Sequence, residues 1–261
     1  FNTVKLTQIF RQASESLIIT NAHLINQGEL PELYSKRSDF FFLRREKDED
    51  IARTIVDLCL YRLPKKYGEQ IRQNIQIISP SRKGGAGTIA LNHMLQEALN
   101  PSSRGKPEKK VRDIVFRVGD KVMQMKNNYD IAWTRGETEG VGIYNGDIGT
   151  VRELNSADES MTIVFDDRVA VYDFSMLDNL EHAYAVTVHK SQGSEYPVVI
   201  IPMYHFSPRL MTRNLLYTAV TRAQEMVILV GQEEIVAAMV NNNRLALRYT
   251  GLAGLLKALD R

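Results

Sequence analysis

Apolar residues recur along the first part of this chain in two alternating patterns. Some stretches carry apolar residues at helical spacing, and others are short apolar runs bounded by polar residues. The pattern predicts helices over 14–22, 49–63 and 89–99, and strands over 39–43 and 75–80. Pro64 is expected to end the second helix. Alternation of strands and helices is typical of an α/β fold with a parallel sheet.

The pattern changes near residue 116, where short strands separated by turns replace the longer elements. Strands are predicted over 148–151, 161–165 and 169–172, with a hairpin-type turn at 145–147 and a second turn at 166–168. This stretch predicts a small antiparallel barrel.

Beyond Leu180 the α/β pattern returns. It predicts a helix to about His189, a strand over 198–201, a helix over 211–223 and a strand over 226–230. The α/β domain is therefore expected to be discontinuous, formed by residues 1–115 and 179–261, with the barrel of residues 116–178 inserted.

Composition narrows the class of protein. Of 261 residues, 33 are Lys or Arg and 31 are Asp or Glu, so a nucleic-acid surface would have to come from a local arrangement of charge. The single cysteine, Cys59, lies in an apolar run and is expected to be a buried structural thiol, which fits a reducing cytoplasm. Apolar runs are too short for a membrane span. Because the chain begins at Phe1 rather than methionine, we expect a piece of a longer protein.

Two segments carry candidate chemistry. Between residues 187 and 193, Thr, His, Lys, Ser and Gln side chains offer donors for phosphate oxygens, and Gly193 permits a positive φ or close backbone approach. The alternative is an ordinary solvated loop. Further on, Arg222 closes the helix predicted over 211–223 and presents a planar guanidinium of the kind that neutralises charge on a transferred phosphoryl group. Taken alone, Arg222 would more often be a surface ion-pair residue.

Together the stretches YAVTVHKSQGSEYP and RNLLYTAVTRAQEMVILVG resemble motifs V and VI of superfamily 1 helicases, in particular the RecD/TraA branch. Residues 6–12 resemble motif IV. Residues 78–88 resemble the loop before the helix that carries Leu91-Asn92 and Leu95-Gln96. The resemblance covers nearly the whole chain.

This resemblance implies a RecA-like parallel sheet with helices on both faces and an inserted SH3-like barrel. It implies that two arginines, Arg11 and Arg222, reach ATP and that Glu195, next to the loop of Gly193, contacts the nucleotide sugar. It also implies a set of residues on the single-stranded DNA side or coupling the two sites: Thr187, His189 and Gln192.

The glycine-rich loop over 81–88 is similar in composition to a phosphate-binding loop, but it lacks the Gly-Lys-Ser/Thr ending of a Walker A motif. We expect Ser81, Arg82 and Lys83 to hold DNA phosphates, the alternative being a merely flexible turn. Tyr129 and Trp133 could stack on a base or belong to the barrel, and we assign them no site.

The sequence shows no pattern for a metal site or a serine hydrolase. The five histidines are scattered without metal-ligand spacing, and no Gly-x-Ser-x-Gly is present. We therefore expect no metal site. The resemblance implies that the chain is the C-terminal part of an ATP-dependent DNA helicase and that this helicase moves 5′ to 3′ along single-stranded DNA. ATP with Mg²⁺ would be bound mainly by an N-terminal motor domain of the same protein, so the chain alone should be inactive, without Walker A and B motifs. Subunits of a nuclease complex are further candidate partners. Two alternatives stay open: a non-catalytic nucleic-acid-binding or partner-docking module, and the helicase half of a conjugative relaxase.

Overall fold

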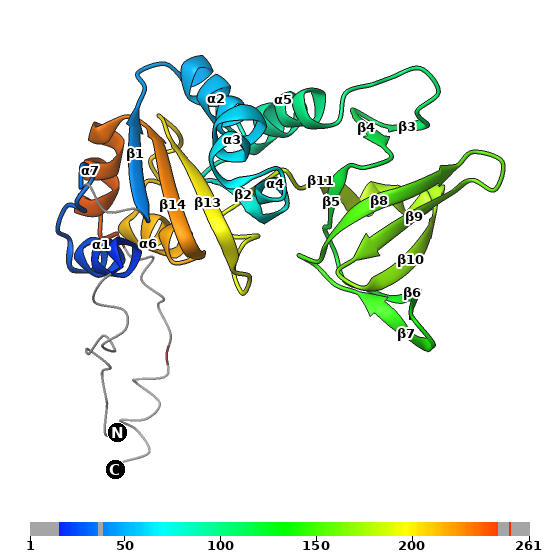
Figure 1. Ribbon diagram of the computed structural model, residues 1–261. Coiled ribbons are helices and arrows are strands. Elements are labelled where there is room, and N and C mark those ends of the chain that lie inside the picture. Colours follow the sequence, from blue (N-terminus) through cyan, green and yellow to red (C-terminus); the bar gives the residue numbers. More distant parts are fainter. Residues whose placement is uncertain (1–15, 36–38, 245–250, 252–261) are drawn as a thin grey trace, which may run out of the picture.

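The chain contains a parallel and an antiparallel β-sheet as its two main sheets (Figure 1). The computed structural model describes residues 16–35, 39–244 and 251. The first sheet is five-stranded, in the order β1-β14-β13-β2-β12, and all of its pairings are parallel. Its strands are β1 (Phe40–Arg44), β2 (Ile75–Ser79), β12 (Ala185–Thr187), β13 (Tyr196–Met203) and β14 (Ala223–Gly231). The motif IV-like stretch, with Arg11, lies outside the described residues.

Helices cover both faces of the parallel sheet, which is why its central strands are apolar almost throughout. All five residues of β2 are buried. One face packs against α1 (Leu17–Gln27), α6 (Arg213–Val220) and α7 (Glu233–Asn241). The other packs against α2 (Asp48–Asp57), η2 (Leu58–Arg62), α3 (Leu63–Tyr67) and α5 (Thr88–Leu99), near the short α4 (Ile71–Asn74). The predicted α/β class is confirmed.

The helix predicted over 49–63 does not end at Pro64. α2, η2 and α3 follow one another without a break to Tyr67, with a π-helical segment directly before the proline. Proline has no N–H to give to the carbonyl four residues earlier, which belongs to Leu60. That carbonyl instead accepts a hydrogen bond from Arg72 Nη2 at 2.7 Å, so the proline is accommodated by a wider turn and an outside donor.

The second sheet is antiparallel, in the order β11-β5-β8-β9-β10-β6-β7, and belongs to the inserted region. Its strands are β5 (Lys121–Gln124), β6 (Asn128–Arg135), β7 (Thr138–Ile143), β8 (Ile148–Asn155), β9 (Ser160–Phe165), β10 (Arg168–Asp173) and β11 (Leu180–His182). A separate two-stranded ribbon, β3 (Glu108–Val111) and β4 (Ile114–Arg117), precedes it, and the 3-10 helix η3 (Phe174–Asn179) lies between β10 and β11.

Buried and partly exposed residues alternate strictly along β9, one of the strands that build the core of this second sheet. Met161, Ile163 and Phe165 of β9 point inward and pack with Phe116 and Tyr172. The two-residue turn after β9 agrees with the prediction. The turn at 145–147 is present, with Gly146 at φ +100°, but it joins β7 to β8, which are not neighbours in the sheet. The hairpin prediction was therefore wrong.

The helix predicted from Leu180 to His189 was also wrong. Its residues form β11, which pairs with β5 of the antiparallel sheet, and β12, which pairs with β2 of the parallel sheet. The helix predicted over 211–223 exists but is shorter, because Thr212 caps its start by accepting from Leu215 N–H and Thr221 closes its end.

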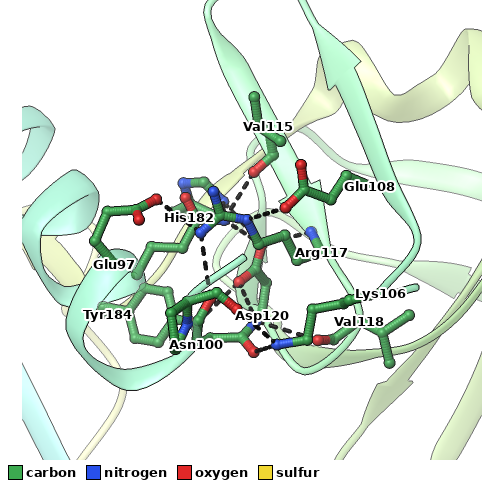
Figure 2. Close-up of polar contacts among 12 residues, drawn as sticks. Glu97, Asn100, Lys106, Glu108, Val115, Arg117, Val118, Asp120, His182 and Tyr184 are labelled. Atoms are coloured by element: carbon green, nitrogen blue, oxygen red, sulfur yellow. Dashed lines mark hydrogen bonds and ion pairs between the residues drawn. The ribbon is translucent and has the colours of Figure 1, made fainter. Parts of the chain in front are cut away.

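A buried polar cluster joins the two sheets at β11 (Figure 2). Asp120 is fully buried and accepts hydrogen bonds from side chains of α5 and of the β11–β12 segment: Gln96 at 2.6 Å, Asn100 at 2.6 Å and Tyr184 at 3.0 Å. His182 lies 3.2 Å from the same carboxylate. Burial opposes ionisation of Asp120, but the hydrogen bonds from His182 and Asn100 outweigh it and hold the pKa of the carboxyl below its usual value.

Beside Asp120, Arg117 extends the cluster. Its guanidinium pairs with Glu97 and with Glu108, each at 2.7 Å. We call the set of Gln96, Asn100, Arg117, Asp120, His182 and Tyr184 the junction cluster. Because all of these groups are tied to one carboxylate or its neighbour, the inserted region and the parallel sheet are held together by hydrogen bonds as well as by apolar contact.

No helix among the described residues is long and apolar enough to cross a membrane.

Candidate functional site

Candidate residues gather at two opposite edges of the parallel sheet. All five strands run in the same direction, so their carboxyl ends meet at one edge and their amino ends at the other. We call these the carboxyl edge and the amino edge.

At the carboxyl edge, the loop after β2 is folded back on itself. Ser81 O accepts from Thr88 N–H at 3.1 Å, and Ser81 Oγ accepts from Lys83 N–H at 3.2 Å. Gly87 has to be small, since a Cβ there would lie 2.6 Å from the carbonyl oxygens of Arg82 and Lys83. These bonds use several backbone amides of the loop internally, while the Arg82 and Lys83 side chains remain exposed.

Thr187, the last residue of β12, and His189, which follows the strand, lie at the same edge. Together with Arg82 and Lys190 they line a cavity of about 170 Å³, which Met123 and Met125 also line. The sequence prediction thus placed Arg82, Thr187 and His189 in one site, and the structure brings them together.

Two contacts at this edge were not predicted. Arg82 Nη2 donates to Glu181 Oε1 of β11 at 2.9 Å, and Lys190 Nζ donates to Asn145 Oδ1 in the turn after β7. Each contact links the parallel sheet to the inserted region. No local pattern could have indicated them, because the partners are 99 and 45 residues apart in the sequence.

At the amino edge, Arg222 and Glu195 come directly before β14 and β13. Arg222 Nη1 donates to Ser194 O at 3.1 Å, and its Nε lies 3.3 Å from Thr218 O. Glu195 is exposed and accepts from Gln224 Nε2 at 3.1 Å. Tyr196 N–H donates to Arg222 O at 2.8 Å, so the starts of the two strands are pinned together. The structure therefore brings Arg222, Glu195 and the neighbouring Gly193 into one cluster.

A single segment, 188–195, joins the two edges, because it leaves the carboxyl end of β12 and enters the amino end of β13. Tight turns build it: Ser191 N–H donates to Thr187 O at 3.1 Å, and the buried Ser191 Oγ donates to Val188 O at 2.9 Å. Gly193 has φ +86°, a conformation that favours glycine, as expected. Gln192 is exposed in this segment and lies outside the cavity wall.

Tyr129 and Trp133 belong to the inserted region. Tyr129 is exposed and packs edge-to-face with Tyr144 at 5.8 Å between ring centroids. Trp133 is partly buried against the barrel core, and the guanidinium carbon of Arg168 lies 6.0 Å from its ring centroid. Within the described ranges, no group of three or more His, Cys, Asp or Glu residues could hold a metal ion.

Two family matches agree with this architecture. Residues 91–165 match the SH3 domain of ATP-dependent RecD-like DNA helicases, and residues 182–230 match the UvrD-like helicase C-terminal domain. The first match covers much of the inserted region, and the second covers β12, the 188–195 segment, Arg222 and most of β14. The chain belongs to the RecD-like branch of the superfamily 1 helicases.

Two curated relatives support the same family. The chain is 34% identical over 223 residues to the ATP-dependent RecD2 DNA helicase of Deinococcus radiodurans, covering 85% of this chain and 28% of that protein. It is 32% identical over 177 residues to the RecBCD enzyme subunit RecD of Mycolicibacterium smegmatis, covering 68% of this chain and 28% of that protein. The chain thus spans little more than a quarter of either relative. A solved Pif1 helicase from Bacteroides, in complex with ADP-AlF3 and ssDNA, aligns over 98% of this chain and 56% of that chain, with 19% identity and a TM-score of 0.49.

Proposed function

We propose that this chain is the second motor domain of an ATP-dependent DNA helicase that moves 5′ to 3′ along single-stranded DNA. ATP would bind between this domain and an N-terminal motor domain of the same protein. The relatives named as a RecD2 DNA helicase and as RecD subunits support this proposal. Because some relatives are named as RecD subunits, we also propose subunits of a nuclease complex as partners, which co-purification would test.

The observation that carries the proposal is the division of candidate residues between two edges joined by one segment. A motor has to couple a change at its nucleotide to a change in its grip on the strand. Segment 188–195 runs from Thr187, in the cavity at the carboxyl edge, to Glu195 beside Arg222 at the amino edge. A movement at one end of this tightly turned segment is therefore transmitted to the other.

At the amino edge, Arg222 is suited to a nucleotide phosphate. Its Nη1 and Nε are held by backbone carbonyls, and its Nη2 makes no hydrogen bond to the residues that the structure describes. A guanidinium anchored in this way can present its free N–H groups to a phosphoryl oxygen. Glu195, exposed beside it, would accept from the nucleotide sugar, with Gly193 letting the backbone approach. Arg11 is proposed as the second arginine on sequence grounds alone.

These residues fit part of an ATP site and not the whole of it. Bound ATP, with Mg²⁺, supplies the phosphoanhydride whose hydrolysis drives the motor, and positive side chains such as Arg222 stabilise the charge that develops on the transferred phosphoryl group. The sequence contains no Gly-Lys-Ser/Thr element to hold the β- and γ-phosphates. We therefore propose that the lysine and the metal ligands come from the N-terminal motor domain and that this chain alone does not hydrolyse ATP.

At the carboxyl edge, the exposed Arg82 and Lys83 would neutralise strand phosphates. Ser81, Thr187, His189 and Gln192 would contribute neutral hydrogen bonds or couple the strand to the nucleotide. Phosphate contacts of this kind position a strand without reading its sequence, as a translocating motor requires.

Replacing Arg222 by alanine in the full-length protein tests the proposal. We expect DNA-stimulated ATP hydrolysis to fall about 10³-fold or more, as for other arginines that act on a transferred phosphoryl group. Arg222→Lys keeps the charge but loses the planar fork and should recover only part of the rate. Arg209→Ala, which removes an exposed arginine from a loop, is the control and should keep the wild-type rate. A near-normal rate for Arg222→Ala would refute the assignment.

A further inference from the structure

Two cavities meet at the Arg82–Glu181 ion pair. The smaller is the cavity of about 170 Å³ beside Thr187 and His189, and the larger, of about 550 Å³, lies between α5 and the β3–β4 ribbon. Arg82, Thr88, Glu181 and His182 line both. The ion pair therefore stands at the boundary between two adjacent hollows, which we treat together as one groove.

The charge of Glu181 is opposite to that of its surroundings in the smaller cavity. Among the described residues that line this cavity, the other charged or titratable side chains are Arg82, His182, His189 and Lys190, and Glu181 alone is acidic. A wall of this composition attracts phosphate, and a carboxylate within it repels phosphate.

The backbone of Glu181 is held firmly in place. Glu181 pairs with Met123 in the β11–β5 ladder, and the next residue, His182, contacts the buried Asp120 of the junction cluster. The strand thus presents the carboxylate toward Arg82 from a fixed support. The Arg82 and Glu181 side chains are 50% and 35% exposed, so water and ions screen their attraction.

We propose that Glu181 acts as a phosphate mimic, whose carboxylate occupies on Arg82 the place that a phosphate of the single strand takes when nucleic acid enters the groove. The strand must displace Glu181 from Arg82, and the joined groove then extends from Thr187 and His189 toward α5. Glu181 consequently lowers the affinity for the strand and keeps the nucleic-acid-free groove neutral at this point. The inference rests on the proposed contact between Arg82 and the strand.

The test compares binding of a fluorescent oligothymidylate to the full-length protein and its variants by anisotropy, at low salt and without nucleotide. Exposed ion pairs are worth roughly 0.2–1 kcal/mol, so Glu181→Gln should bind about 1.4- to fivefold more tightly than wild type. Arg82→Gln should bind more weakly. In the double variant, Glu181→Gln should bring little or no gain, because the arginine that it releases is gone. Glu46→Gln removes the same charge from another exposed ion pair, that with Arg44 after β1, and should match wild type.

The possible outcomes separate the inference from the function on which it rests. Equal or weaker binding by Glu181→Gln, while Arg82→Gln weakens binding, overturns the phosphate-mimic role and leaves the proposed function standing. A full gain from Glu181→Gln in the absence of Arg82 also overturns it, since the effect would then be general charge repulsion. If Arg82→Gln binds like wild type, the proposed contact fails and the inference fails with it.

Discussion

The two edges of the parallel sheet hold their arginines in different ways. At the carboxyl edge, Arg82 is exposed and paired with a carboxylate from β11. At the amino edge, Arg222 is half-buried and bound to backbone carbonyls of the sheet's own connections. An arginine paired with a partly exposed carboxylate can exchange it for another anion, whereas one anchored by carbonyls keeps its position. Under the proposed function, the exchangeable arginine would hold a strand that is gripped and released, and the anchored arginine would meet a phosphoryl group in a fixed geometry.

The edges also differ in what supports them. The carboxyl edge contacts the inserted region through Glu181, Lys190 and the junction cluster, while at the amino edge the hydrogen-bond partners of the Arg222 and Glu195 side chains lie in the 188–195 segment, α6 and β14. Changes at the junction should therefore affect strand binding before they affect ATP hydrolysis.

Asp120→Ala should have the largest effect on stability. It removes a fully buried carboxylate and leaves the donors of Gln96, Asn100 and Tyr184 without their acceptor. We expect a loss of about 3 to 5 kcal/mol in the free energy of unfolding, measured by urea denaturation. Asp167→Ala, in an exposed turn of the same sheet, should change it by less than about 0.5 kcal/mol.

The same variant tests the comparison of the edges. In the protein that remains folded, strand affinity should fall while the ATPase rate at saturating DNA is retained. A rate that falls in parallel with affinity would mean that the junction supports both edges equally.

Lys121→Met should have a smaller effect, in the opposite direction. Lys121 Nζ donates to Gln76 Oε1 at 2.9 Å, and burial lowers the pKa of the ammonium to about 8. A depressed lysine pKa means that the fold disfavours the charged form, so the cost is complete below pH 8 and disappears as the pH rises to the unfolded value near 10.5. We expect the variant to be about 1 to 2 kcal/mol more stable at pH 7, with the difference shrinking between pH 8 and 10.5. A variant less stable than wild type at pH 7 would contradict this account of the Lys121 ammonium.

Sequence predicted the parts of the fold that depend on local pattern. The buried strands β1, β2, β13 and β14, the helix α5 and the alternating strand β9 all carry their periodicity in consecutive residues. The helix prediction for 180–189 was wrong because the apolar residues of this stretch belong to two strands in different sheets. Which sheet each strand joins depends on partner strands that are distant in the sequence. The prediction that the helix ends at Pro64 was wrong because Arg72, from another helix, donates a hydrogen bond to the Leu60 carbonyl that proline leaves without a partner.

For the candidate site, too, the sequence indicated the residues but not their arrangement. The motif-like stretches indicated Arg82, Thr187, His189, Gly193, Glu195 and Arg222, which the structure gathers into two clusters. The sequence could not place the two clusters at opposite edges of the sheet, because that requires knowledge of the strand directions. The contact of Glu181 with Arg82 required the three-dimensional fold, because it joins the strand that closes the inserted region to a loop of the parallel sheet.

The most direct test of the central claim, that the two edges have separate roles, measures two constants for Arg82→Gln and Arg222→Ala in the full-length protein. One is the rate of ATP hydrolysis at saturating oligothymidylate, and the other is the dissociation constant of that oligonucleotide without nucleotide. Separate roles predict that Arg82→Gln weakens binding severalfold and leaves the rate within about twofold, while Arg222→Ala lowers the rate by about 10³ and leaves binding nearly unchanged. If each variant shifts both constants together, the division of labour between the edges is contradicted.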